Sequence, residues 1–103
     1  MAMGGFGNMQ NMLRQAKKMQ EELQEKQEEL DETEVIGSVA GGMVQITMMG
    51  NKTIKSVKIK PEAVDPDDIE MLEDLIISAF NDANAKVDEL KEELFDNMPK
   101  GLF

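Results

Sequence analysis

Apolar residues recur every three or four positions over the first third of the chain. The repeating positions are Met9, Leu13, Ala16, Gln20, Leu23, Gln27 and Leu30. This spacing predicts a helix that begins at Asn8 as its N-cap and ends near Glu34. Because two of these positions are glutamine, the stripe predicts a weak helix–helix contact and not a leucine zipper. Residues 1–7 are small and glycine-rich, which predicts a flexible tail.

The helical period is lost after Glu34, and β-branched residues gather in short segments separated by glycine. Strands are predicted over residues 35–40, 43–49 and 53–60. Hairpin turns are predicted between them, at Gly41-Gly42 and Gly50-Asn51. Side chains alternate along a strand, so Val44, Ile46 and Met48 share one face of the second strand. Ile54 breaks the alternation of the third strand, which predicts a β-bulge or an early twist there.

A second helical stripe follows Pro61. The run from Asp65 to Asp68 predicts a helix start, with Asp65 as the N-cap and Pro66 at the first helical position. Apolar residues then keep a spacing of three or four up to Leu94, and residues 97–103 are predicted to be a flexible tail. The pattern predicts one α+β domain over residues 1–103. Its elements are a long N-terminal helix, a three-stranded antiparallel sheet and a long C-terminal helix.

The predicted helices are longer than the predicted sheet. At 1.5 Å per residue the two helices reach roughly 40 and 45 Å, whereas a seven-residue strand reaches only about 23 Å. The helices must therefore cover each other, or a second subunit must cover them. A two-fold homodimer is the simplest arrangement that does so. The residues predicted for its interface are Val44, Ile46, Met48, Ile76 and Phe80.

Charge is sorted along the chain, although the net charge is −10. Two segments are basic: residues 1–20 carry three cations and no acid, and residues 35–60 carry four lysines and no acid. The other two segments are acidic: residues 21–34 carry eight acids and one lysine, and residues 61–103 carry thirteen acids and three lysines. A polyanion responds to the local potential, so DNA binding stays open. The candidate phosphate contacts are Arg14, Lys17 and Lys18. Their alternative interpretation is an ordinary solvated helix face.

Lys52, Lys55, Lys58 and Lys60 form a second basic zone, on the third predicted strand and the turn before it. On an edge strand, lysines more often prevent edge-to-edge aggregation. The chain has no Trp or Tyr, so an aromatic platform for stacking bases is not expected. Binding to DNA is therefore expected to use the phosphate backbone and to be largely indifferent to base sequence.

Catalytic and metal-binding functions are disfavoured by composition. The chain has no Cys and no His, which removes the usual thiolate ligands and the usual neutral-pH base. Helix capping accounts for Asp65, Asp67 and Asp68, so neither a metal nor a cofactor is expected. No signal-peptide pattern and no membrane-length apolar run are seen, which predicts a soluble cytoplasmic protein.

The ten methionines are explained by a pliable core or a subunit interface, or by an adaptable binding surface. An adaptable binding surface, together with the acidic net charge, leaves an alternative function open. The protein would then be an adaptor or chaperone-like scaffold that holds an unidentified protein partner with projecting helices.

The order of elements resembles the YbaB/EbfC family of bacterial nucleoid-associated proteins. The matching segments are residues 7–30, 41–76, 79–90 and the apolar ending 99–103. The resemblance implies a tweezers-like homodimer that binds double-stranded DNA, alters its conformation and lies at the nucleoid. It also implies roles in nucleoid organisation, gene regulation or DNA protection. The cations that it implicates, on the two helices, are Arg14, Lys17, Lys18, Lys86 and Lys91.

Overall fold

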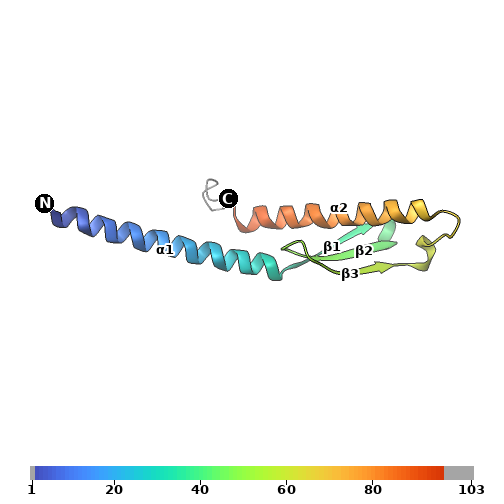
Figure 1. The fold of residues 1–103 in the computed structure, drawn as a ribbon, viewed down its shortest axis with the longest axis horizontal. Coiled ribbons are helices and arrows are strands. Elements are labelled where there is room, and N and C mark those ends of the chain that lie inside the picture. Colours follow the sequence, from blue (N-terminus) through green and yellow to red (C-terminus); the bar gives the residue numbers. More distant parts are fainter. Residues whose placement is uncertain (1, 97–103) are drawn as a thin grey trace.

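A computed structural model describes residues 2–96 of the protein (Figure 1). The main elements are α1 (Ala2–Glu32), β1 (Glu34–Val39), β2 (Val44–Met49), β3 (Ile54–Ile59) and α2 (Ile69–Leu94). Short 3₁₀ turns at Ala40–Gly42 and Pro61–Ala63 follow β1 and β3. The predicted α+β order is confirmed, and each strand lies within one residue of its predicted bounds. The predicted tail at 97–103 falls outside the described residues.

Helix α1 begins at Ala2, so the prediction that Asn8 is its N-cap is wrong. Asn8 lies inside the helix, and residues 2–7 are helical instead of irregular. Extending an existing helix adds one backbone hydrogen bond for each residue that is fixed. The first proline of the chain is Pro61, so nothing as disruptive as proline interrupts α1.

The sheet is antiparallel in the order β1-β2-β3. Thr47 pairs with Ser56 while Met48 pairs with Ile54, so Lys55 is an extra residue and the predicted bulge is confirmed. The inner face of the sheet carries Val44, Ile46 and Met48, whose side chains are fully buried. The outer face carries the alternate residues of each strand.

Helix α2 covers the inner face over β1 and β2 and approaches β1 very closely. Its contact residues Ala79 and Ala83 are small and fully buried. A Cβ atom added at Gly37 would lie 2.2 Å from the Ala79 carbonyl oxygen and 2.5 Å from the Ala83 nitrogen. Only glycine therefore fits at this point of β1.

Helix α2 begins three residues later than predicted. Asp65 caps a turn instead of the helix, because its Oδ1 accepts a hydrogen bond from the Asp67 nitrogen at 2.9 Å. Asp68 is the N-cap, and its Oδ1 accepts from the Met71 nitrogen at 3.2 Å. Pro66 thus lies in the turn that precedes the helix.

Among the described residues, helix α1 contacts the other elements near its C-terminal end. Leu30 is buried, and the Lys26 Nζ donates to the Leu94 carbonyl oxygen at 2.7 Å, at the C-terminus of α2. The first half of α1 projects away, which makes the molecule 81 Å long but only 19 by 17 Å across (Figure 1). Its apolar residues Met9, Met12 and Leu13 are more than 60% exposed. Within residues 2–96, no helix is long and apolar enough to cross a membrane.

Candidate nucleic-acid interface

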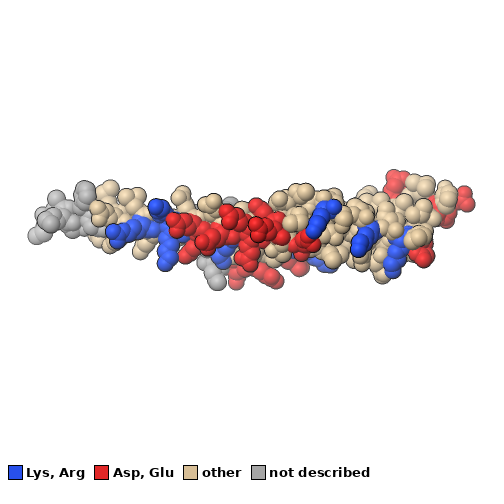
Figure 2. All heavy atoms as spheres, turned by 90° about the horizontal axis from the view of Figure 1, so that it is seen from below, with Lys and Arg blue, Asp and Glu red and all other residues tan. Residues whose placement is uncertain are grey.

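The cations of α1 lie together on its projecting half. Arg14, Lys17 and Lys18 are exposed, and the acids of the helix begin only at Glu21. The ion pairs found among the described residues involve Lys52, Lys55 and Lys86, so these three cations are unpaired there. Figure 2 shows them as a blue group beside a red acidic stretch. We call these three residues the α1 patch.

Two members of the α1 patch, Arg14 and Lys18, lie opposite the apolar stripe of the helix, whereas Lys17 lies beside the stripe, about 40° around the helix from Leu13. At 100° per residue, Arg14 lies about 140° around the helix from Met9, and Lys18 about 180° from it. Arg14 and Lys18 can therefore face a polyanion while the stripe faces another protein surface, and Lys17 lies at the boundary between the two sides. This arrangement, an unpaired cationic face on a projecting helix, suits contact with a phosphate backbone.

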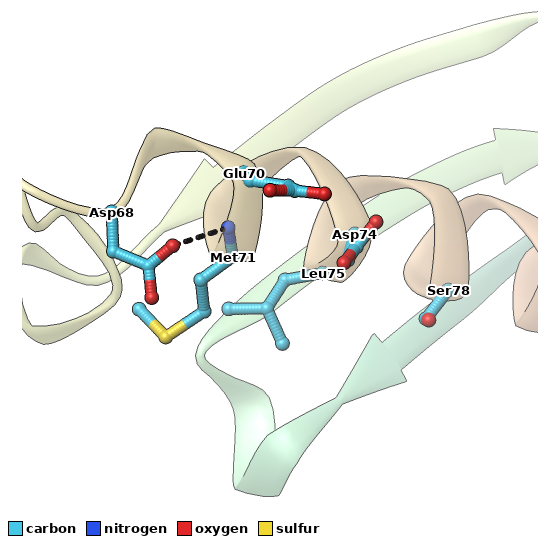
Figure 3. A pocket seen from close by; sticks show the side chains of 6 residues that line it. All are labelled: Asp68, Glu70, Met71, Asp74, Leu75 and Ser78. Carbon is cyan, nitrogen blue, oxygen red and sulfur yellow. Dashed lines mark hydrogen bonds between the residues drawn. The ribbon is translucent and has the colours of Figure 1, made fainter.

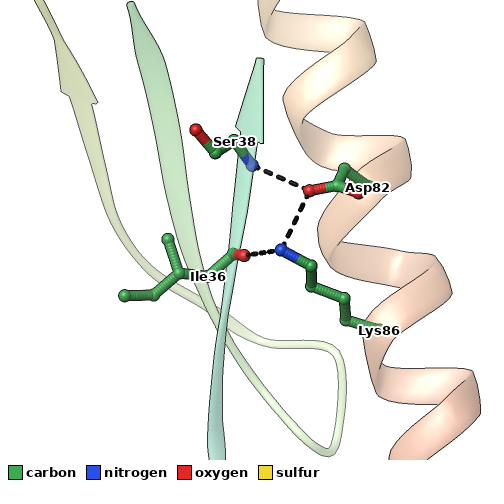
Figure 4. A network of polar contacts seen from close by, with 4 residues as sticks. All are labelled: Ile36, Ser38, Asp82 and Lys86. Atoms are coloured by element: carbon green, nitrogen blue, oxygen red, sulfur yellow. Dashed lines mark hydrogen bonds and ion pairs between the residues drawn. The ribbon is translucent and has the colours of Figure 1, made fainter. Parts of the chain in front are cut away.

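Lys86 lies on α2 beside β1, and its ammonium group has partners within the chain. Its Nζ donates to the Ile36 carbonyl oxygen at 2.7 Å and pairs with Asp82 Oδ2 at 3.2 Å (Figure 4). The same Oδ2 accepts from the Ser38 nitrogen at 2.9 Å. The hydrogen bond from the Ser38 nitrogen lowers the pKa of the Asp82 carboxyl most, and the hydrogen bond from Lys86 lowers it further. The network occupies the free edge of β1, where Lys86 has a structural function.

Lys91 is exposed on α2, but acids dominate its surroundings. A hollow of about 340 Å³ on the same part of the helix is lined by Glu89, Glu92, Glu93 and Asp96. The local potential there is unfavourable for phosphate. The structure therefore does not join Lys86 and Lys91 to the α1 patch in one surface.

A second hollow lies at the start of α2 and is also acidic. It has a volume of about 320 Å³, and its lining includes the carboxylates of Asp68, Glu70 and Asp74 (Figure 3). Among the described residues no group of three or more side chains is placed to hold a metal ion. The acidic lining of this hollow does not extend the interface.

Lysines form a second group on the outer face of β3. On this face Lys58 lies opposite Gln45 of β2, and Ser56 lies opposite Thr47. The backbone of Lys60 is still extended, so its side chain lies on the same face as that of Lys58. The signal for this grouping was present in the sequence, because Ser56, Lys58 and Lys60 alternate with Val57 and Ile59. The sequence could not show that this face lacks a covering helix.

A family model described as the YbaB/EbfC DNA-binding family matches residues 4–102. The chain belongs to the YbaB/EbfC family. The family expected from the sequence is thus confirmed.

Relatives in the YbaB/EbfC family align over almost the whole chain. A nucleoid-associated protein of Geobacillus kaustophilus is 57% identical over 99% of this chain and 94% of its own length. Another, from Ruminiclostridium cellulolyticum, is 46% identical over the same shares. A crystal structure of an uncharacterized Helicobacter pylori protein has a TM-score of 0.72 at 24% identity, over 84% of this chain and 91% of that one. That likeness confirms the fold.

The residues predicted for a dimer interface divide into two groups in this YbaB/EbfC member. Val44, Ile46 and Met48 are fully buried beneath α2 and have no surface left for a partner, so the prediction is wrong for these three. The sequence showed that they share a face but not that the chain's own helix covers it. Ile76 is half-buried and Phe80 is 38% exposed, so both remain available.

Proposed function

We propose that this protein is a nucleoid-associated protein that binds double-stranded DNA largely without sequence specificity and alters its conformation. The observation that carries the proposal is the α1 patch on a projecting helix of a chain from a DNA-binding family, three cations without an ion-pair partner among the described residues. Roles in nucleoid organisation, gene regulation and DNA protection fit such binding. The proposed location is the bacterial cytoplasm, at the nucleoid.

The proposed contact is with the phosphate backbone. Lysine and arginine neutralise phosphates and release counterions, which needs no base sequence. The acidic second half of α1 and the acidic α2 repel DNA, so they restrict the duplex to the cationic end of α1. Lys91 is a secondary candidate contact, whereas the partners of Lys86 make it a weaker one.

We also propose that the protein is a two-fold homodimer. Helix α2 does not cover β3, and Ile54, Val57 and Ile59 are at least 40% exposed on the inner face of the sheet. Phe80 lies about 160° around α2 from Asp82, which contacts the β1 edge, so Phe80 faces the β3 side. We call these four residues the open apolar surface.

A second copy of the chain suits the open apolar surface. Monomeric proteins rarely leave a large contiguous apolar patch in water, and a self-complementary patch favours a two-fold pair. Ile76 lies one turn before Phe80 on the same side of α2, so this second predicted interface residue lies next to the open apolar surface. In such a dimer the α1 patch would be doubled to six cations.

Replacing Phe80 by aspartate is expected to convert the dimer to a monomer. The new carboxylate would have to be buried in the interface without a partner, which costs several kcal/mol. The measurement is the mass in solution by light scattering after size-exclusion chromatography. Ile36→Asp is the matched control, because Ile36 is 52% exposed on the outer face of the sheet. A Phe80→Asp protein with the mass of the parent would exclude this interface.

The binding function is tested by fluorescence anisotropy of two labelled duplexes of unrelated sequence at several salt concentrations. Equal affinity for both duplexes is expected. Six phosphate contacts predict that log affinity falls against log salt with a slope of about −5. A preference of more than about tenfold for one duplex would contradict backbone recognition. An absence of binding even at low salt would contradict DNA binding and favour the protein-adaptor alternative.

A further inference from the structure

The lysines near β3 differ in how they are neutralised. Lys52 pairs with Asp88 at 3.1 Å, and Lys55 pairs with Glu34. Lys58 and Lys60 are exposed, and the ion pairs found within residues 8–96 do not include them. Two full positive charges are therefore left on the outer face of β3.

The surroundings of these two lysines suit phosphate oxygens. Gln45, Thr47 and Ser56 share the outer face with Lys58, and their polar side chains are of the kinds that bind DNA phosphates beside lysine. The one acid of the strands, Glu34, already pairs with Lys55. We call Lys58, Lys60 and these three polar residues the lysine face.

The lysine face stays accessible in the proposed dimer. Lys58 alternates along β3 with Val57 and Ile59, so the lysines and the open apolar surface lie on opposite sides of one strand. Burial of the apolar side against a second copy leaves the lysine side in solvent.

The lysine face and the α1 patch are separate in electrostatic terms. The acidic stretch from Glu21 to Glu34 lies between them and is about 20 Å long at the helical rise per residue. That length is about twice the Debye length at physiological ionic strength. Figure 2 shows the same order on one side of the molecule, with blue groups on both sides of a red stretch.

We propose that the lysine face is a second contact site for DNA phosphates, so that protein bound to one duplex through the α1 patch links it to another duplex. This inference rests on the proposed DNA binding. With only two free cations, the lysine face alone binds weakly, and it acts when many bound copies present it together. The competing explanation is that these lysines only keep the free edge of β3 from aggregating.

The experiment measures linking and binding separately. A duplex fixed to beads is coated with the full chain, and capture of a second, labelled duplex is counted. Anisotropy of a short duplex is measured in parallel. The variant is Lys58→Gln with Lys60→Gln. The control is Asn81→Glu with Ala85→Glu, which lowers the net charge by the same two units on the exposed side of α2.

The expected result is at least about a fivefold loss of capture for the glutamine pair. Its affinity for a single short duplex should change less than about threefold, because the α1 patch is intact. Lys58→Arg with Lys60→Arg should restore capture, since arginine keeps the charge. If the glutamine pair aggregates without DNA, Lys58→Glu with Lys60→Glu, which keeps the edge charged, takes its place.

The inference would be overturned if the glutamine pair, or the glutamate pair that takes its place, captured the second duplex as well as the parent does. It would also be overturned if the parent bound duplexes without linking them. An equal loss in the Asn81 and Ala85 control would also overturn it, because net charge would then account for the effect. A parent that binds no duplex at all would instead overturn the proposed function itself.

Discussion

Gly37→Ala is expected to lower the free energy of unfolding by about 3 kcal/mol or more. The added Cβ would lie 2.2 Å from the Ala79 carbonyl oxygen and 2.5 Å from the Ala83 nitrogen, which are backbone atoms of α2. A flexible side chain could move aside, but a helix backbone moves only as a unit, so α2 must lift from β1. Overpacking of this kind costs typically 1–3 kcal/mol, and a backbone clash belongs at the upper end.

The measurement for Gly37→Ala is thermal unfolding at fixed protein concentration, and a fall in Tm of more than about 10 °C is expected. Ser38→Ala is the matched control, because this neighbour lies on the outer face and should change stability by less than about 0.5 kcal/mol. Adding Ala83→Gly should restore only part of the loss, since it removes the contact with the Ala83 Cβ and leaves both backbone contacts. Equal melting of Gly37→Ala and the parent would show that α2 does not approach β1 this closely.

Reversing the charge of Arg14, Lys17 and Lys18 to glutamate is expected to lower DNA affinity by about 10³-fold or more at about 50 mM salt. The loss has two causes, because six phosphate contacts per dimer disappear and six carboxylates replace them. Glutamate, lysine and arginine have similar helix propensities, so α1 should keep its structure. Affinity by anisotropy and mass by light scattering are measured together, and the mass should stay that of the parent.

A neutral variant with glutamine at the same three positions separates the effect of charge at the α1 patch on DNA affinity from the effect of the net charge. Its matched control carries Ser78→Glu, Asn81→Glu and Ala85→Glu, which also lowers the net charge by three. The glutamine variant should show the shallower salt dependence that follows from lost phosphate contacts, whereas the control should keep the slope of the parent. A parental affinity in the glutamate variant would remove the α1 patch from the proposed interface.

Sequence periodicity predicted the elements well where burial is regular. Val44, Ile46 and Met48 alternate because β2 has one side in the core, and the structure buries all three. The helix starts were predicted less well. Asp65 and Asp68 are both good N-caps, and the choice between them depends on the turn after Pro61 and on where α2 meets the sheet.

Candidate contacts on one helix face could be predicted, whereas those spread over several elements could not. Arg14 and Lys18 share a face because a helix repeats every 3.6 residues, so their grouping is local. The environment of Lys86 is not local, since Ile36 lies fifty residues earlier in the chain. For the same reason the sequence could not tell which of the four lysines near β3 have partners.

The sequence by itself determined the family, the order of elements, the bulge in β3 and the cationic segment of α1, because each depends on residues close together in the chain. Tertiary structure decided which apolar faces are covered. Helix α2 crosses β1 and β2 over Gly37, which buries the three β2 residues predicted for an interface and leaves β3 open. A helix can cover only the strands that its path reaches, and that path is set by contacts between residues about forty positions apart.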